Sequence, residues 1–432
     1  MKHIILLLWL YGSAAKGQLT ISGLDSLFAF ADKNSSVSKT NVQQSLLAKW
    51  TKVAALANTV NFKNPVTFSS TDNLRLPVSF IPAEIFGGPA GTFRQITLGQ
   101  QYVSNFNYNP QVDIVNPYNW AKVKSASINK ELTEVSNQIA RKTLYENMAA
   151  AYYNILALQE QIVVSEKSLT ASDSVLLIVK NKFSQGIIRE QDVNNATVNK
   201  LNVMDKLNQL RAMLNQQMNT LKILCDIPSG TDLAVKDNPT EEMNGSLKAT
   251  SNLQSRFNIL QSSYAKNELR ANRWSMLPTL SLFYYQGWQQ NSNLAFFDNK
   301  ATWIQSQYIG VKISMPIPPD VTKLSQTYTT KINYRIAELN NSHTQLQTEL
   351  DNKNLEIDYD KASSSYSLAK QIFELKNSNY VKSLNQYREG ILSTDDLLTA
   401  FNDLLNSQLN LVSAYSSARF NRSKLIINNS VK

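Results

Sequence analysis

The chain has little of what disulfide-rich and metal-dependent proteins contain. Its 432 residues include one Cys and two His. A single Cys excludes an intramolecular disulfide framework, and Cys225, His3 and His343 are too isolated to form a zinc-binding cluster. The sequence also lacks a Gly-rich phosphate loop, a Gly-x-Ser-x-Gly elbow and a His paired with a nucleophile. We therefore predict no enzyme, no catalytic residues, no cofactor and no metal.

Long apolar runs and dense basic tracts are also missing. No interior stretch approaches the roughly 20 consecutive apolar residues that a membrane-spanning helix needs. The formal charge of +10 is spread along the chain without a Lys/Arg tract, so nucleic-acid binding is not predicted. Hydrophobic residues make up 43% of the chain, which is too many for a disordered protein.

The first residues have the order of a cleaved export signal. Lys2 is followed by the apolar run Ile4 to Leu10 and then by small residues. Cleavage after Ala15 or after Gly17 fits, and we prefer Gly17, which makes residues 1–17 the signal. A buried N-terminal strand is the alternative. The mature protein is expected to be exported.

Glycine and proline are nearly absent from two long ranges, 118–226 and 320–428. Each range has no Pro and a single Gly, Gly186 in the first and Gly390 in the second. Because these are the residues that end helices, the pattern predicts two helical hairpins that turn at the two glycines. A long arm of about 65 residues would measure about 100 Å.

Apolar residues follow a three-four spacing along these arms, which is typical of coiled-coil packing. In the second hairpin the stripe reaches His343, which we expect to be a buried core histidine and not a ligand. Cys225 is expected to pack where the first hairpin ends. Helices this long need neighbours, either from the same chain or from other copies. The stripe of the second long arm is Ile332, Ile336, Leu339, His343, Leu346 and Leu350.

The two hairpins are related by an internal repeat with a constant offset in the numbering. The segment Phe183 to Ala196 aligns with Tyr387 to Ala400. In both segments an aromatic residue, a Gly, two aliphatic residues, an Asp and an Ala coincide. The glycine supplies the left-handed residue that ends one helix, and an N-capping pair starts the next. This indicates duplication of a whole hairpin-bearing unit.

Segments with alternating apolar residues precede each hairpin. They predict strands at about 64–71 and 93–107 in the first half, and at about 278–290 and 307–317 in the second. Aromatic residues lie at their ends, as in transmembrane barrel strands. By alternation alone, soluble β-hairpins remain the alternative.

Four strands cannot close a barrel, because even a small closed barrel has about eight. Open sheet edges are not tolerated in lipid. If these strands span a membrane, several chains must share one barrel. The segments from Ser69 to Thr92 and from Asn291 to Ser306 would then be its external loops.

Three motifs resemble the TolC-type outer-membrane efflux protein family, over essentially the whole mature chain. Residues 19–24 (LTISGL) are similar to the family's LTLxEAL opening, residues 271–282 (ANRWSMLPTLSL) to its A…LPxLxL segment, and residues 310–317 (GVKISMPI) to its GLSLSxPL segment. Their order, the duplication and the export signal together make the resemblance specific.

The resemblance implies a mainly α protein with a β-barrel portion: a homotrimer in which each chain gives four strands to one barrel in outer-membrane lipid. The long coiled-coil hairpins of the duplicated unit would form a periplasmic tunnel. A periplasmic adaptor protein and an inner-membrane pump are the implied partners. The implied function is an exit duct for efflux or type I secretion.

The resemblance also implies a gate at the hairpin ends. By motif position, Tyr387 and Asp192 resemble the family's inter-hairpin tyrosine–aspartate contact, and Asp396 resembles a constriction aspartate. The alternative is that both aspartates only cap helices. Three positions depart from the family, and they are Leu392, Gln191 and Thr399.

We expect a first repeat at 18–225, comprising an N-terminal helix, two strands and a hairpin. A second repeat at 259–432 has the same parts, and an equatorial segment at 226–258 joins the two. The competing interpretation of the whole chain is an exported periplasmic coiled-coil protein with a structural or adaptor role.

Overall fold

The computed structural model describes residues 19–237, 248–317 and 320–431. The expected export signal lies outside these ranges, as do residues 238–247 of the expected equatorial segment. The chain divides into two compact units. The first consists of Met1–Ser45, Glu134–Phe257 and Ser342–Lys432, and the second of Leu46–Thr133 and Asn258–Asn341.

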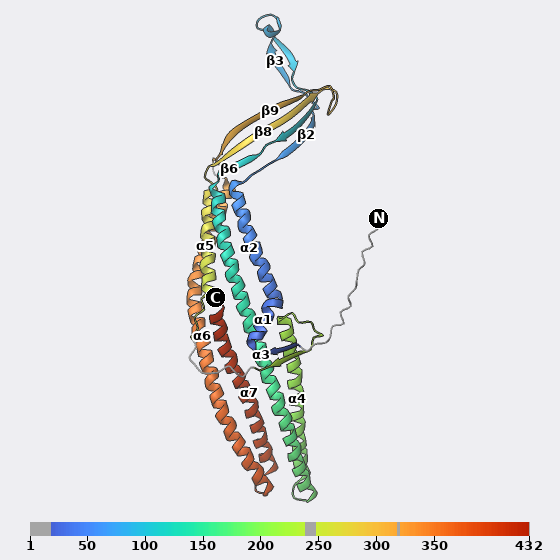
Figure 1. Ribbon diagram of the computed structural model, residues 1–432, viewed down its shortest axis with the longest axis vertical. Coiled ribbons are helices and arrows are strands. Elements are labelled where there is room, and N and C mark those ends of the chain that lie inside the picture. Colours follow the sequence, from blue (N-terminus) through green and yellow to red (C-terminus); the bar gives the residue numbers. More distant parts are fainter. Residues whose placement is uncertain (1–18, 238–247, 318–319, 432) are drawn as a thin grey trace, which may run out of the picture. The chain divides into compact units, whose positions relative to one another are not determined.

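Four helices form the two predicted hairpins, which are confirmed (Figure 1). The long arms are α3 (Pro117–Ser184) and α6 (Val321–Arg388), with 68 residues each. The return arms are α4 (Glu190–Leu224) and α7 (Thr394–Ser430). The two long arms start at positions that differ by the same offset as Phe183 and Tyr387. The ends of the long arms differ by this offset too, and so do the starts of the two return arms. The repeat that the tip motifs predicted therefore extends over the whole hairpin.

The starts of the long arms are set by side-chain caps that obey the same offset. Asn116 Oδ1 accepts a hydrogen bond from the backbone N–H of Asn119 at 3.2 Å. Asp320 Oδ1 accepts one from the N–H of Thr322 at 2.9 Å. Each cap satisfies a donor that has no partner within its own helix. Pro117 suits the first helical position, because its missing N–H would be unpaired there.

The first unit also contains a small parallel sheet. Strand β1 (Leu19–Ser22) pairs with β7 (Leu233–Lys236). Cys225, at the end of α4, is buried as expected. Helix α1 (Leu24–Asn34) follows β1 and buries Leu27 and Ala31 completely.

Two further helices complete the set, α2 (Ser36–Val60) and α5 (Leu253–Trp274). Ser35 separates α1 from α2, so the expected N-terminal helix is two helices. Among the described residues, no helix is long and apolar enough to cross a membrane.

The second unit holds a curled antiparallel sheet of five strands. Its central strand β8 pairs with β9 along one edge, and with β5 and β6 along the other. Strand β2 pairs with the far side of β5. The strands of the sheet are β2 (Val66–Asp72), β5 (Tyr102–Tyr108), β6 (Gln111–Val115), β8 (Thr279–Ser292) and β9 (Trp303–Ser314).

These five strands occupy four positions across the sheet. Strands β5 and β6 follow each other along the same edge of β8, with Asn109 and Pro110 between them. The ladder continues through the gap, since the N–H of Tyr284 donates to the carbonyl of Pro110 at 3.0 Å. The order across the sheet is therefore β2, β5 with β6, β8 and β9. Within the described residues, the outer edges of β2 and β9 pair with no further strand.

The segment expected as one strand at 93–107 is two strands with a turn between them. Strand β4 (Phe93–Thr97) ends before Gly99, which has φ +100°, and β5 begins at Tyr102. Strand β4 pairs with β3 (Val78–Pro82), which lies in the segment expected to be an external loop. A 3₁₀ turn, η1 (Ala83–Phe86), follows β3, and this hairpin forms a sheet of its own (Figure 1).

The main sheet has one apolar face. Paired residues of antiparallel strands point to the same side, so the register defines the faces. The rows of the apolar face start at Leu280 paired with Ile313 and continue through Leu282 with Val311 and Tyr284 with Ile309. The fourth row is polar, Gln286 paired with Gln307, and in the fifth Trp288 pairs with Gln305. From Leu280 to Trp288 the face measures about 27 Å along the strand.

The opposite face of the sheet is mixed and mainly polar. It carries three aromatic rings together with serine, asparagine, glutamine and lysine side chains. Its residues include Ser281, Phe283, Tyr285, Gly287 and Gln289 of β8, Ser306, Tyr308 and Lys312 of β9, and Asn105 and Asn107 of β5.

The apolar stripe of α6 is exposed in the single chain. Its five aliphatic residues are between 48% and 60% exposed. His343, expected to be buried in this stripe, is also exposed, so that expectation is wrong for the single chain. The physical reason is that no described segment covers this part of α6. The exposed aliphatic residues are Ile332, Ile336, Leu339, Leu346 and Leu350.

Candidate functional site

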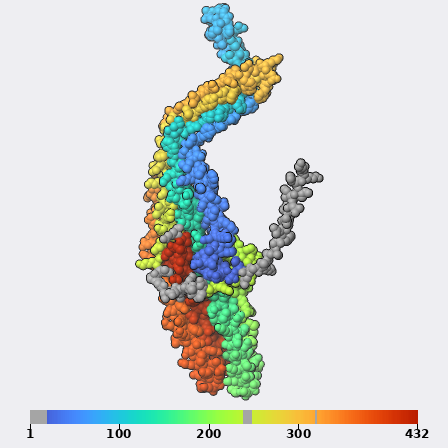
Figure 2. Space-filling view, in the orientation of Figure 1, coloured from blue at the N-terminus to red at the C-terminus, as the bar shows by residue number. Residues whose placement is uncertain are grey.

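The two hairpin ends lie side by side in the first unit (Figure 2). Gly186 has φ +73° and Gly390 has φ +81°, so both adopt the left-handed conformation that the sequence predicted. The residue after each glycine donates its N–H to a carbonyl in the last turn of the helix. These bonds are Ile187 to Lys182 at 3.0 Å and Ile391 to Gln386 at 2.9 Å.

Both aspartates of the candidate site lie in the capped first turns of the return helices. The Asp192 carboxylate accepts a hydrogen bond from the backbone N–H of Arg189 at 3.0 Å. The Ser393 hydroxyl accepts from the N–H of Asp396 at 3.1 Å and donates to the Asp396 carboxylate at 2.6 Å. Carboxylates at these positions also face the positive end of the helix dipole. Asp192 therefore caps the start of α4, and Asp396 is held by the Ser393 cap of α7.

Tyr387 is the buried residue of the site, with 2% of its surface exposed. Its hydroxyl pairs with the Thr394 hydroxyl at 3.3 Å, and it makes no hydrogen bond with Asp192 in the described chain. Burial raises the pKa of Tyr387, and the charge of Asp192 raises it further. The phenol is therefore neutral at physiological pH, and Asp192 acts on it through its charge.

Lys182 is a residue of this site that sequence reasoning missed. Its ammonium group donates to the backbone carbonyl of Tyr387 and lies 4.2 Å from the centre of the Tyr387 ring. A cation over an aromatic face is attracted by the ring's quadrupole. A second contact joins the return arms, where Asn195 donates to the carboxylate of Asp395 at 2.9 Å. Both contacts tie the first hairpin to the second.

Apolar packing between the hairpins surrounds these polar contacts. Helices α3, α4, α6 and α7 all contribute to it. Tyr387 belongs to this cluster, so the ring under the Lys182 ammonium is also packed against both hairpins. The buried members are Val175, Leu176, Val179, Ala196, Tyr387, Leu397 and Leu398.

The three positions that depart from the family have ordinary roles in the single chain. Leu392 is half-buried and packs against the apolar cluster. Gln191 is exposed. Thr399 is also exposed, and its hydroxyl donates to the carbonyl of Asp395 at 2.8 Å.

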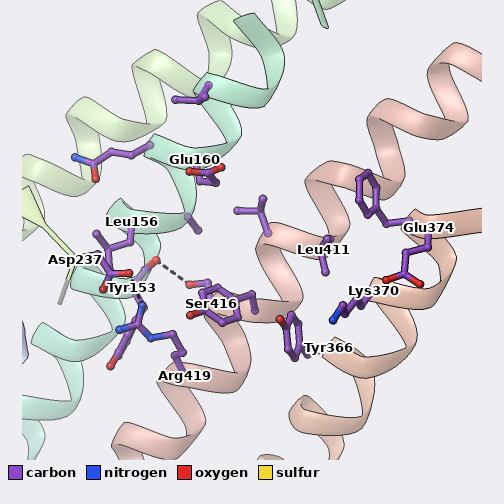
Figure 3. Close-up of a pocket in the computed structure, with 16 residues that line it drawn as sticks. Tyr153, Leu156, Glu160, Asp237, Tyr366, Lys370, Glu374, Leu411, Ser416 and Arg419 are labelled. Atoms are coloured by element: carbon purple, nitrogen blue, oxygen red, sulfur yellow. Dashed lines mark hydrogen bonds and ion pairs between the residues drawn. The ribbon is translucent and has the colours of Figure 1, made fainter. Parts of the chain in front are cut away.

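A cavity of about 610 Å³ lies between α3, α6 and α7 in the first unit (Figure 3). Arg419, which is 5% exposed, forms an ion pair there with Asp237 at 2.7 Å. Its guanidinium carbon lies 5.2 Å from the centre of the Tyr153 ring and 5.6 Å from that of Tyr415. Burial opposes the charge of Arg419, but the hydrogen bond to Asp237 raises its pKa overall. This cluster ties the segment after β7 to α3 and α7.

A match to a known protein family covers part of the sheet and the first hairpin. The outer membrane efflux protein family matches residues 97–225, from β4 through α4. This match covers about three tenths of the chain. The resemblance predicted from the motifs is confirmed, and so is the outer-membrane localisation. The efflux protein family is not an enzyme class. No curated protein matches the chain significantly.

Solved outer-membrane channels share the fold of this chain. VceC of Vibrio cholerae has 17% identity and a TM-score of 0.74, with 94% of this chain and 95% of that chain covered. CmeC of Campylobacter jejuni has 17% identity and a TM-score of 0.70 over 94% and 85% of the two chains. The open state of MtrE of Neisseria gonorrhoeae has 14% identity and a TM-score of 0.70 over 94% and 88%. The predicted fold class is thereby confirmed.

Among the described residues, no group of three His, Cys, Asp or Glu side chains is placed to hold a metal ion. The chemistry available at the hairpin ends is charge, hydrogen bonding and apolar packing. Such groups can open or close a passage, attract ions or bind another protein.

Proposed function

We propose that three copies of this chain form one exit duct in the outer membrane, which passes substrates outward without chemistry of its own. The duct receives them from an inner-membrane pump through a periplasmic adaptor protein, in a tripartite efflux or type I secretion system. Each copy contributes two repeats, 18–225 and 259–432, joined by the equatorial segment 226–258.

The observation that carries the proposal is the open sheet with an apolar face. Ile309, Val311 and Ile313 of β9 are 71%, 62% and 73% exposed in the single chain. A contiguous apolar surface of this kind marks a membrane or protein contact. In a bilayer, all backbone polar groups must be paired, so the edges of β2 and β9 need partners. Further copies of the same sheet supply them when β9 of one copy pairs with β2 of the next.

Strand number supports three copies. The sheet has four positions, so three copies give twelve, which is well within the range of membrane barrels. The exposed stripe of α6 has the coiled-coil spacing expected for helix neighbours that this chain does not supply. The similar channels are described as outer membrane channels, which supports a duct and not an isolated coiled coil.

The hairpin ends are proposed as the narrow, gated end of the duct, with Asp192, Tyr387 and Asp396 around it. Replacing Tyr387→Phe removes the hydroxyl that pairs with Thr394 at 3.3 Å. We expect the resting single-channel conductance to rise, because a contact that holds the closed end is lost. If the conductance does not change, the site reduces to the helix caps that Asp192 and Ser393 make.

The test of the proposed function is the native mass of the full-length protein, extracted in detergent from the outer-membrane fraction. A particle of about three times the chain mass that conducts ions in planar bilayers is the expected result. A monomer or dimer in the soluble periplasm would contradict the duct and favour an exported coiled-coil structural or adaptor protein.

A further inference from the structure

A cavity of about 430 Å³ lies where β8 turns into β9, and no step of the proposed function uses it. Its volume is within the range of about 300–1,000 Å³ that small-molecule sites occupy. The β8–β9 connection, residues 293–302, forms much of its lining. Gln100, between β4 and β5, also lines it. The cavity therefore belongs to the segments that the sequence placed outside the strands.

Hydrogen bonds to the neighbouring strand ends hold the β8–β9 connection in place. The buried Gln290 side chain donates to the backbone carbonyls of Asp298 at 2.8 Å and Ala301 at 2.9 Å. The Asn293 side-chain oxygen accepts from the N–H of Gln101 at 3.0 Å, which joins the connection to the segment before β5. The lining of the cavity is therefore pre-organised, and pre-organisation lowers the cost of binding a ligand.

Several polar groups of this cavity have unused hydrogen-bonding capacity. The side-chain oxygen of Gln100 is buried and accepts no hydrogen bond from any described residue. Asn291 uses its side-chain oxygen to accept from Gln289 at 2.9 Å, as Asn293 does with Gln101. Within the described chain, the amide N–H groups of the two asparagines donate to nothing. A buried polar atom without a partner calls for one from outside the chain.

The charges of the lining balance, and part of the lining is apolar. The backbone N–H of Lys300, at 2.9 Å, and the hydroxyl of Ser292, at 2.7 Å, donate to Asp298 and lower the pKa of its carboxyl group. Its carboxylate is therefore ionised at neutral pH, and each oxygen can accept a further bond. Lys300 balances this charge, so the lining does not favour an anion. Leu294 and Ile304, which are 74% and 59% exposed, add an apolar surface.

We propose that this cavity binds a neutral saccharide. A sugar has neighbouring hydroxyl groups, each of which donates and accepts, and a face of C–H groups that is apolar. The two asparagine amides supply donors for these hydroxyls, while Gln100 and Asp298 supply acceptors. The side chains of Leu294 and Ile304 suit the C–H face of the ring. A few placed polar groups beside apolar walls are the usual composition of a small-molecule site.

The proposed function puts this site at the outer mouth of the duct, and only that location rests on it. Ile304 pairs with Gln289 and so lies on the mainly polar face of the sheet, which faces the lumen in the proposed barrel. Asn291 lies on the same face by alternation. A saccharide bound here would stand at the rim of the passage. A free glycan and the sugar part of an outer-leaflet glycolipid share this chemistry.

Two substitutions remove proposed contacts, and each has a matched control. Asn293→Asp keeps the oxygen that accepts from Gln101 and exchanges the free amide donor for a second oxygen. Asn299→Asp adds the same charge to the same connection at a residue that does not line the cavity. Gln100→Met removes the buried acceptor with a side chain of similar size. Gln95→Met makes the same exchange on β4, outside the lining.

Binding is measured by surface plasmon resonance on the full-length protein in detergent. The probes are a panel of neutral free oligosaccharides of glucose, galactose, mannose and N-acetylglucosamine, and separately lipopolysaccharide in phospholipid vesicles. We expect saturable binding by the wild type and both controls. In Asn293→Asp and Gln100→Met the affinity should be about tenfold lower, the loss that one well-made hydrogen bond produces. Binding of a free oligosaccharide identifies a soluble glycan, and binding of the vesicles alone identifies a glycolipid.

Binding of neither probe by the wild type would overturn the inference. Equal affinities in each variant and its control would overturn it as well. Thermal midpoints show whether the variants keep their fold; if Asn293→Asp lowers the midpoint, Gln100→Met decides. Native mass separates the outcome from that of the proposed function. A trimer that binds no saccharide refutes only the inference, whereas a monomer that binds it refutes the duct and leaves the site in place.

Discussion

The assignment of a lipid-facing side to the sheet is open to a direct test. In the variant Ile309→Lys, a charge is placed in the third of the five rows of the apolar face, between Leu280 and Trp288. Ile309 is 71% exposed in the single chain and pairs with Tyr284. A lysine near the midplane on the lipid side of a barrel costs about 2–4 kcal/mol. With one such site per chain, a trimer carries three.

Ser306→Lys is the matched control, because Ser306 lies on the opposite face of the same strand and pairs with Gly287. The native Lys312 is on that face as well, so the face already accepts a lysine. We expect the control to change stability by less than about 0.5 kcal/mol, which is usual for surface positions.

The assay is urea unfolding of the protein after insertion into phospholipid vesicles, followed by tryptophan fluorescence. The unfolding midpoint should fall clearly for Ile309→Lys and stay near the wild-type value for Ser306→Lys. Equal shifts in the two variants, or a larger shift in the control, would refute the assignment of the faces.

Two further predictions concern the first unit. Arg419→Met should lower the free energy of unfolding by about 2 kcal/mol, because it removes the ion pair with Asp237 and the contacts with the rings of Tyr153 and Tyr415. Asp237→Asn should lower the free energy of unfolding by less, because the Asp237 side chain is 40% exposed. The thermal midpoints of both variants are measured in detergent. A larger fall for Asp237→Asn than for Arg419→Met would contradict this prediction. Burial raises the pKa of Cys225 to about 11. At pH 8 about one thiol in a thousand is therefore ionised. Labelling of Cys225 by a thiol reagent should be slow at pH 8 and faster as the pH approaches 11. Fast labelling of folded protein at pH 8 would contradict this burial.

The hairpins were predictable from sequence because their signals are local. Helix ends depend on nearby residues such as Gly186, Gly390 and Ser393, and the structure places all three as expected. The caps of the return helices could be predicted from the sequence for the same reason.

The contacts across the hairpins could not be predicted in this way. Lys182 and Tyr387 are 205 residues apart in the sequence, and no local pattern links them. The break of the expected strand at 93–107 was hidden as well, because alternation continues on both sides of Gly99. The exposure of His343 has a different cause, since the neighbours that its stripe requires are not part of one chain.

The equal length of α3 and α6, 68 residues each, has a consequence for the evolution of this sequence. One residue of helix adds about 1.5 Å and turns the following side chains by about 100°. A single deletion in α3 alone would rotate Lys182 away from Tyr387 and leave the two turns at different heights. A deletion of the same size in α6 would restore the contact between Lys182 and Tyr387 and bring the two turns back to the same height. Insertions and deletions in the long arms should therefore be inherited in pairs, and relatives of this chain should have long arms that differ from these by the same number of residues in both halves.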